Sequence, residues 1–521
     1  MPLDPVLTEE SAQLPDIELG EHDSAPSRRS FLVVGALAAL GLRPTRTEAQ
    51  HSRRLPLPAG TARFQTIQQG EVPSAPATWR DKTSRLLRRA TYGATPADLA
   101  LARSLGYQGW LSQQLKYTRI PDTAVAAAVA ERYPLLAGTG EQLYQADVNA
   151  VTTQLQQATI FRAAFSQRQL YERMVEFWSD HFNIYIRDVY YLKLIDDREV
   201  IRKHALGRFG DLVKASARSA AMLAYLDQTQ SRVGRPNQNY ARELMELHTL
   251  GVDGGYSQND VAELARVLTG WTIRGRGDFY FDPTGHDWAA KTVLGVTIPA
   301  GSPALGQDGI KEGERIIDLL LAHPSTARFI STKMLRWLLT SEPSESQIRT
   351  VSGVYRSTGG DIAAMVRAIL NDGWIAAAPV RYKRPFHFIV SGMRALGATV
   401  TSTDAVNRQL GSLGQPLFIW ETPDGYPDTV EWWAGNITPR WSFSNVLSTY
   451  RTTAINVDSA PFMTAGVDGA IDTIDQRVFA GEIAPSTRSA LRAYLVGGAF
   501  NDTRVRETLG LAIASSDFQW Y

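Results

Sequence analysis

Apolar positions recur along most of this chain with the period of an α-helix. This spacing puts the apolar side chains of a segment on one helical face, which then packs against a core. The pattern predicts a mainly α-helical protein, built as one large multi-helical domain. The longest apolar-periodic runs lie near 150–166, 168–182, 207–226, 237–249, 307–322, 324–340, 360–371, 383–396 and 486–514.

Two helix starts carry a capping signal. The segment 95–98 reads Thr-Pro-Ala-Asp, with Pro at the first helical position, and predicts a helix that stops at Gly106. The segment 257–260 reads Ser-Gln-Asn-Asp and predicts a helix that runs to Leu268. In both segments the first side chain can accept from the backbone N–H three residues on, which satisfies a donor that the helix leaves free.

Strand-like sequence is scarce. The best case is Phe279–Phe281, followed by a turn at 283–285 and by Thr292–Thr297. These two runs predict one small β-hairpin inserted into the helical domain. The stretch from Gly411 to Trp441 is dense in Pro, Gly and Trp, and we expect a loop-rich aromatic segment there.

The N-terminal segment has the order of features of a twin-arginine signal peptide. Residues 27–32 read S-R-R-S-F-L, and Arg28 and Arg29 precede a modest apolar run from Phe31 to Leu42. Small residues before Ala49 predict cleavage after that residue. Two alternatives remain: an uncleaved leader that anchors the chain, and an unrelated arginine pair before a short buried helix.

These features predict a division into three parts: a signal peptide (1–49), a linker rich in Pro, Gly, Ser and Arg (50–83) and the helical domain (84–521). The twin-arginine translocase is the partner that the leader predicts, and the mature protein is expected in the periplasm or outside the cell. Beyond the leader, no apolar run reaches the roughly 20 residues of a membrane span.

Charge and composition exclude several classes of protein. The net charge is +1, so no overall positive field favours nucleic acid as a partner. The chain has no cysteine, which removes disulfides, zinc–thiolate sites and a thiol nucleophile. No phosphate-binding glycine loop, G-x-S-x-G elbow or H-E-x-x-H helix is present.

The segment 237–251 places two carboxylates on one helical face. Asn239, Glu243 and Glu246 share that face, with Arg242 beside them. Two like charges three residues apart repel one another unless a cation lies nearby. The pair is therefore interpreted either as metal ligands or an acid–base pair, with His248 close to the helix end, or as a buried Glu–Arg network that joins helices.

Two further polar groups are candidates. In 172–183, Glu172, Glu176 and Asp180 form an acidic stripe at a spacing of four residues, while His181 lies on the opposite, aromatic face. A histidine in such surroundings is more often a core residue than a ligand. In 281–288, His286 and Asp287 lie on a polar loop of the predicted hairpin, and loops often place functional groups over a cleft.

Several of these segments resemble DUF1800, a bacterial family named as a domain of unknown function. The similarity covers about 84–521, and its most specific part is NQNYARELMELHTLGVDGGYSQNDVAELARVLTGWTI (237–273), with Gln238 where the family usually has Glu. The resemblance implies a large, often exported bacterial protein, but no established reaction. Other similar segments are RRATYGATPADL (88–99), ERMVEFWSDHFNI (172–184), FDPTGHDW (281–288), KRPFHF (383–388), GQPLFIWETPDGYP (414–427) and SSDFQW (515–520).

Two functions follow as hypotheses, and the sequence leaves open whether the protein is an enzyme. The first is an exported metal-dependent enzyme that acts on a cell-surface or extracellular polymer, with a divalent ion as cofactor. The second is a non-catalytic protein of the cell envelope that binds carbohydrate through Trp420, Tyr426, Trp432, Trp433 and Trp441, although core packing would equally explain those rings. For the enzyme, the candidate catalytic residues are Glu243, Glu246, His286 and Asp287, and the candidate metal ligands are His181, Glu243, Glu246, His248 and His286.

Overall fold

The computed structural model describes residues 79–449 and 454–521. The chain divides into two units, 1–68 and 69–521, and all described residues belong to the second. The predicted signal peptide and most of the predicted linker, with Arg28, Arg29 and Ala49, lie outside the described residues. No helix of the described part is long and apolar enough to cross a membrane.

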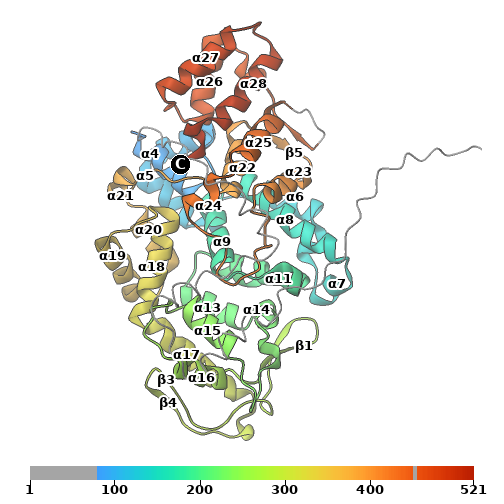
Figure 1. Ribbon diagram of the computed structural model, residues 1–521, viewed down its shortest axis with the longest axis vertical. Helices are drawn as coiled ribbons and strands as arrows, with labels where there is room; N and C mark the ends of the chain where they lie inside the picture. The colour runs from blue at the N-terminus through green and yellow to red at the C-terminus, as the bar shows by residue number, and fades with distance from the viewer. Residues whose placement is uncertain (1–78, 450–453) are drawn as a thin grey trace, which may run out of the picture. The chain divides into compact units, whose positions relative to one another are not determined.

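The described chain is mainly α-helical, as predicted (Figure 1). Each predicted apolar-periodic run coincides with one helix or with two consecutive helices. The first half contains α4 (Lys82–Ala90), α5 (Pro96–Leu115), α6 (Thr123–Arg132), α7 (Gly140–Gln145), α8 (Val148–Phe165), α9 (Gln169–His181), α10 (Ile186–Val189), α11 (Tyr191–Asp196), α12 (Arg202–His204), α13 (Phe209–Ala217), α14 (Ala220–Tyr225), α15 (Gln238–Glu246) and α16 (Gln258–Val267). The second half contains α17 (Ile310–Ala322), α18 (Pro324–Leu338), α19 (Glu345–Thr358), α20 (Ile362–Ile369), α21 (Asp372–Ala377), α22 (Pro385–Ala395), α23 (Asp404–Ser412), α24 (Val430–Ala434), α25 (Ile437–Thr449), α26 (Gly466–Val478), α27 (Pro485–Val496) and α28 (Asp502–Ala514).

Both predicted capping boxes form. Thr95 caps α5 and Ser257 caps α16, each in reciprocal contact with the Asp three residues later. The prediction that the first of these helices stops at Gly106 was wrong in part. Gly106 adopts a φ of 68° and kinks the chain, but helical structure resumes and continues to Leu115. A glycine tolerates this conformation because it has no Cβ, so it interrupts the helix without ending it.

The β-structure of the described residues consists of three two-stranded antiparallel sheets. The predicted pairing of Phe279–Phe281 with Thr292–Thr297 was wrong. Instead each run pairs with its nearest neighbour in sequence, because glycines at 275, 277 and 295 supply the positive φ that tight turns require. The strands are β1 (Trp271–Arg274) with β2 (Asp278–Phe281), β3 (Lys291–Val293) with β4 (Val296–Ile298), and β5 (Thr399–Val400) with β6 (Ile455–Asn456).

Most buried apolar side chains fall into two large clusters. The first core is formed mainly by side chains from α4, α5, α9 and α13 to α20. The second core is formed by α22, α25, α26 and α28 together with Tyr92 and the C-terminal half of α8. Helix α9 belongs to the first core and α8 and α22 to the second, so the boundary between the two cores runs along α9.

Candidate functional site

The two carboxylates predicted on one helical face lie on α15, near the surface of the protein. Glu243 and Glu246 are half-buried, and Tyr256 donates its hydroxyl to Glu246 Oε2 at 3.2 Å. Arg242 donates to Gln258 Oε1 at 3.0 Å, so it forms no ion pair with either glutamate. Burial and the neighbouring Glu246 raise the pKa of Glu243 to about 7. This pair does not form the Glu–Arg network that was one interpretation of the sequence.

His181 and His248 are core residues. Their ring centroids lie 6.2 Å apart, and aromatic side chains that include Phe182 surround them. Burial and the positive charge of Lys333 lower the pKa of His181 well below its ordinary value and that of His248 to about 3. Both imidazoles are therefore neutral at physiological pH.

His286 and Asp287 each belong to an ion network, and the two networks meet at Lys291 and Thr269. His286 Nδ1 lies 2.7 Å from the carbonyl of Thr269, and its Nε2 lies 3.2 Å from Glu312, which also pairs with Lys291 at 2.7 Å. Asp287 pairs with Arg266 at 2.7 Å. These contacts join the loop before β3 to α16 and α17.

The five candidate metal ligands are thus distributed over three places: the aromatic core, the surface of α15 and the loop before β3. Across residues 79–449 and 454–521, no group of three or more His, Asp or Glu side chains could hold a metal ion. His181 and His248 share one location and Glu243 and Glu246 another, but His286 lies with neither pair. Metal binding by this set stays a prediction to which the geometry adds no support.

A cavity of about 40 Å³ lies where the two cores meet, and we call it the α9 cavity. Its lining includes the acidic stripe of α9, Glu172, Glu176 and Asp180, together with side chains from both cores. Glu172 is not available for chemistry, because it forms a two-pronged ion pair with Arg202 at 3.1 Å from each carboxylate oxygen. The remaining lining residues are Tyr92, Thr159, Ala163, Val175, Ser179, Asn183, Asp197, Arg384, Phe386, Gln415, Leu417, Phe418 and Tyr426.

Glu176 is the most distinctive group of the α9 cavity. Its Oε2 accepts from the Tyr92 hydroxyl at 2.8 Å and pairs with Arg173 at 3.0 Å. Its Oε1 is buried and has no hydrogen-bond partner among the described residues. Burial raises the pKa of Glu176 despite the nearby Arg173 and Arg384. With both donors on Oε2, Oε1 is the atom that would carry the proton.

Asp180 lies one helical turn from Glu176 and is held as an ion pair. Arg384 contacts Asp180 Oδ2 at 2.8 Å, and the backbone N–H of Tyr426 donates to Oδ1 at 3.2 Å. The Arg384 guanidinium also lies 5.2 Å from the Trp337 ring centroid and 5.9 Å from that of Tyr426. The cavity therefore combines a carboxyl whose pKa is raised with a carboxylate held in an ion pair.

The loop before α24 closes one side of the cavity. Asn183 donates through its Nδ2 to the carbonyls of Trp420 at 2.9 Å and Thr422 at 2.7 Å. Gly425 adopts a φ of 76°, and a Cβ at this position would lie 2.2 Å from the carbonyl oxygen of Asp180. Only glycine permits this approach of loop and helix, which also brings the N–H of Tyr426 to Asp180.

A family model described as a protein of unknown function (DUF1800) matches residues 85–520. The chain belongs to the DUF1800 family. Every residue that lines the α9 cavity lies inside the matched region. Neither the search of curated proteins nor the search of solved structures found a match.

The sequence contained a signal for this DUF1800 cavity, but it did not identify the groups that define it. The spacing of Glu172, Glu176 and Asp180 placed them on one helical face. Nothing in that spacing showed that Glu176 would be buried or that Glu172 would be paired with Arg202. Tyr92 and Arg384 come from segments far away in sequence, so only the packing of α4, α9 and α22 reveals their contacts.

We predict that Gly425→Ala destabilises this DUF1800 protein by about 1–3 kcal/mol, because the new methyl group meets the Asp180 carbonyl in a backbone conformation that disfavours alanine. The control is Gly353→Ala in α19, where a Cβ has no neighbour within 4 Å. It should be neutral or slightly stabilising, because alanine favours helices. Urea unfolding measures the stability of both variants. Equal changes in stability would contradict the close approach of Gly425 to the Asp180 carbonyl.

We also predict a pH-dependent effect of Glu243→Gln. The folded protein holds the Glu243 proton more tightly than the unfolded chain. The associated stability is complete below the ordinary pKa of 4.5 and is lost as the pH rises through about 7.

The glutamine of Glu243→Gln stays neutral at every pH. The free energy of unfolding of this variant, relative to that of the native protein, should therefore increase by on the order of 1 kcal/mol between about pH 5 and about pH 8. Urea unfolding at the two pH values measures this difference. Glu131→Gln, at an exposed position of α6, is the control and should show no such gain. Parallel stability profiles for the native protein and Glu243→Gln would refute the prediction.

Proposed function

We propose that this protein is an exported enzyme that cleaves glycosidic bonds in an extracellular or cell-envelope polysaccharide. The observation that carries the proposal is Glu176: a carboxyl with a raised pKa, one oxygen held by Tyr92 and Arg173, and the other without a partner in a lined cavity. General acid catalysis requires a carboxyl whose pKa lies above its ordinary value, and the pKa of Glu176 is shifted in that direction.

In this proposal the loop before α24 moves away from α9 to admit the substrate, because the α9 cavity holds only a few water molecules and Glu176 Oε1 is buried. Glu176 Oε1 then donates its proton to the glycosidic oxygen as the bond from that oxygen to the sugar carbon breaks. The sugar carbon becomes positively charged, and the fixed carboxylate of Asp180 stabilises that charge. Water then adds to the carbon, and its released proton returns to Glu176. Each turnover consumes one water molecule and restores the carboxyl group, so no external oxidant or reductant is needed.

An aromatic group beside the cavity supports a carbohydrate as substrate. The ring of Tyr426, which lines the cavity, lies 4.9 Å from that of Trp420, and Trp420 lies 5.9 Å from Trp432. All three side chains are half-buried, so each retains some surface on which a sugar ring can stack. Trp433 differs, because it is buried and donates its Nε1–H to the carbonyl of Pro427 at 2.8 Å.

Export is part of the proposal and rests on the leader sequence. The twin-arginine motif at Arg28 and Arg29, the apolar run and the small residues before Ala49 support transport through the twin-arginine translocase. The mature enzyme would then encounter its polymer in the periplasm or outside the cell. The chain has no cysteine, so its folding does not depend on disulfide formation before or after export.

We predict that Glu176→Gln lowers the rate of polysaccharide cleavage by about 10²–10⁴-fold, because glutamine cannot donate the proton. The measurement is the release of reducing ends from a panel of bacterial and plant polysaccharides. In the native protein, activity should fall as the pH rises through the raised pKa of Glu176, since the acid must be protonated.

Glu131→Gln on α6 makes the same chemical change far from the cavity in sequence and should retain full activity. Urea unfolding of Glu176→Gln shows whether the variant is folded. Glycosidase activity that survives in a folded Glu176→Gln protein would refute the assignment of the acid.

A second candidate function is carbohydrate binding without catalysis, which the aromatic group favours. Trp432→Ala is expected to weaken glycan binding about tenfold, because it removes one stacking surface. Trp441→Ala is the matched control, since this side chain is 57% exposed and lies outside the aromatic group. Isothermal titration measures both variants. Binding lost in Trp432→Ala without turnover in any form of the protein would establish this second function instead.

A further inference from the structure

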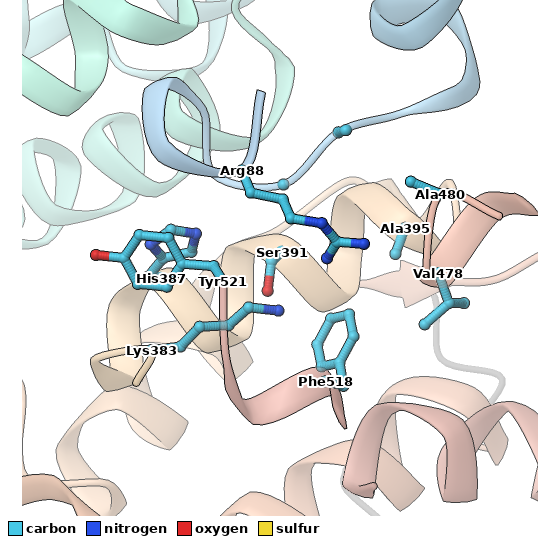
Figure 2. Close-up of a pocket in the computed structure, with 11 residues that line it drawn as sticks. Arg88, Lys383, His387, Ser391, Ala395, Val478, Ala480, Phe518 and Tyr521 are labelled. Carbon is cyan, nitrogen blue, oxygen red and sulfur yellow. The ribbon is translucent and has the colours of Figure 1, made fainter. Parts of the chain in front are cut away.

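A second cavity, of about 20 Å³, lies beside α22 and is lined by basic and aromatic side chains together with small residues (Figure 2). Lys383 and Arg88 extend into it from opposite sides, with Ser391 between them and Phe518 below. We call it the Lys383 cavity. Its wall combines α4, α22, the end of α26 and the segment 518–521, which are far apart in sequence.

Lys383 is a buried basic group without a counter-charge. The residue is 3% exposed, and its ammonium group has no hydrogen-bond or ion-pair partner among the described residues. The Nζ atom lies 3.4 Å from the centroid of the Phe518 ring, which offers only a partial substitute for an anion. Burial, together with Arg88 and Arg440, lowers the pKa of Lys383 well below its ordinary value.

Other hydrogen-bond donors around the cavity also lack acceptors. Arg88 donates through one terminal nitrogen to the carbonyl of Phe479 at 2.6 Å, but its Nε–H has no partner in the described structure. His387 is buried against Tyr521, at 4.2 Å between ring centroids, and neither of its ring nitrogens has a partner there. Arg440 donates to Gln519 Oε1 at 2.9 Å and to the carbonyl of Lys383 at 2.7 Å.

The nearest carboxylates are used elsewhere. Glu482 accepts through Oε1 from the backbone N–H of Arg80 at 2.7 Å and of Asp81 at 3.0 Å, while its Oε2 has no hydrogen-bond partner among the described residues. Asp517 accepts from the N–H of Ala484 at 3.2 Å. Asp475 accepts from the N–H of Ile483 and pairs with Arg488. None of these carboxylates forms an ion pair with Arg88 or Lys383, although each attracts the Arg88 charge from a distance.

We propose that the Lys383 cavity binds a small monovalent anion of the size of chloride. Two buried basic groups that face one cavity repel one another and lose hydration when both are charged, and an anion between them offsets both costs. The volume suits one such ion, since a water molecule needs about 10–15 Å³ on the same measure. A tetrahedral oxyanion such as phosphate, with five heavy atoms, is too large.

The bound ion would join α4, through Arg88, to α22, through Lys383, and to the chain near Phe518. This role is independent of glycosidic cleavage in the α9 cavity. An ion that binds the folded state and not the unfolded chain stabilises the fold in proportion to the logarithm of its concentration once the site is occupied. Stability should therefore depend on the identity of the anion and not on ionic strength alone.

The test begins with full-length protein dialysed into sodium gluconate. The chloride NMR linewidth is then measured as sodium chloride is added, with and without competing bromide. The native protein should broaden the chloride signal, and bromide should reverse the broadening. The urea midpoint should be higher in chloride than in gluconate at equal ionic strength, with a difference that saturates.

Lys383→Met removes the charge but keeps an unbranched side chain, and it should abolish both the broadening and the difference in midpoint. Lys116→Met, at an exposed position, should change neither. If Lys383→Met does not fold, the bromide competition on the native protein decides. No bromide-reversible broadening, or equal midpoints in chloride and gluconate, would overturn the proposal, and a higher midpoint in phosphate than in chloride would overturn the assigned size.

Discussion

A buried guanidinium at the centre of the molecule sets the arrangement around it. Arg173 lies on α9 and is fully buried, with the rings of Tyr92, Trp337 and Tyr521 within 6 Å of its charge. Such a group needs a hydrogen-bond acceptor, and Glu176 Oε2 supplies one about one turn along the same helix. The same contact leaves Oε1 of Glu176 without a partner. The group that satisfies Arg173 is therefore also the carboxyl with the free oxygen on which the proposed function depends.

The boundary between the two hydrophobic cores explains why the α9 cavity lies where it does. Side chains of a single core interdigitate closely, whereas the surfaces of two cores meet with charged groups between them. Along α9 these charges are matched in pairs, Glu172 with Arg202 and Asp180 with Arg384. Glu176 is the member whose burial raises its pKa in spite of its partner, so the functional group and the structural groups share one stripe.

The two cavities differ in the charged side chains that line them. The α9 cavity is lined by carboxylates with cations nearby, and it suits proton transfer to a neutral substrate. The Lys383 cavity is lined by basic groups that form no ion pair among the described residues, and it suits an anion. Tyr92 connects them, because its hydroxyl contacts Glu176 while its ring lies 5.7 Å from that of His387.

The sequence by itself determined the helical class, the helices of the apolar-periodic runs and both capping boxes, because these depend on local periodicity and on contacts three or four residues apart. It also determined that His181 lies in aromatic surroundings and that Glu176 and Asp180 share a face. Only the tertiary structure decided which strands pair, since the glycine turns at 275–277 and 294–295 closed shorter hairpins than the apolar pattern indicated.

Tertiary structure likewise separated the candidate ligands His286 and Glu243. Both lie in polar segments, and spacing along one chain does not show whether distant segments meet. The tertiary structure instead brings Tyr92 and Arg384 into contact with α9, although both are far from it in sequence. Burial and pairing are properties of these long-range contacts, which is why the sequence could point to the acidic stripe but not to the one carboxyl in it that keeps a free oxygen.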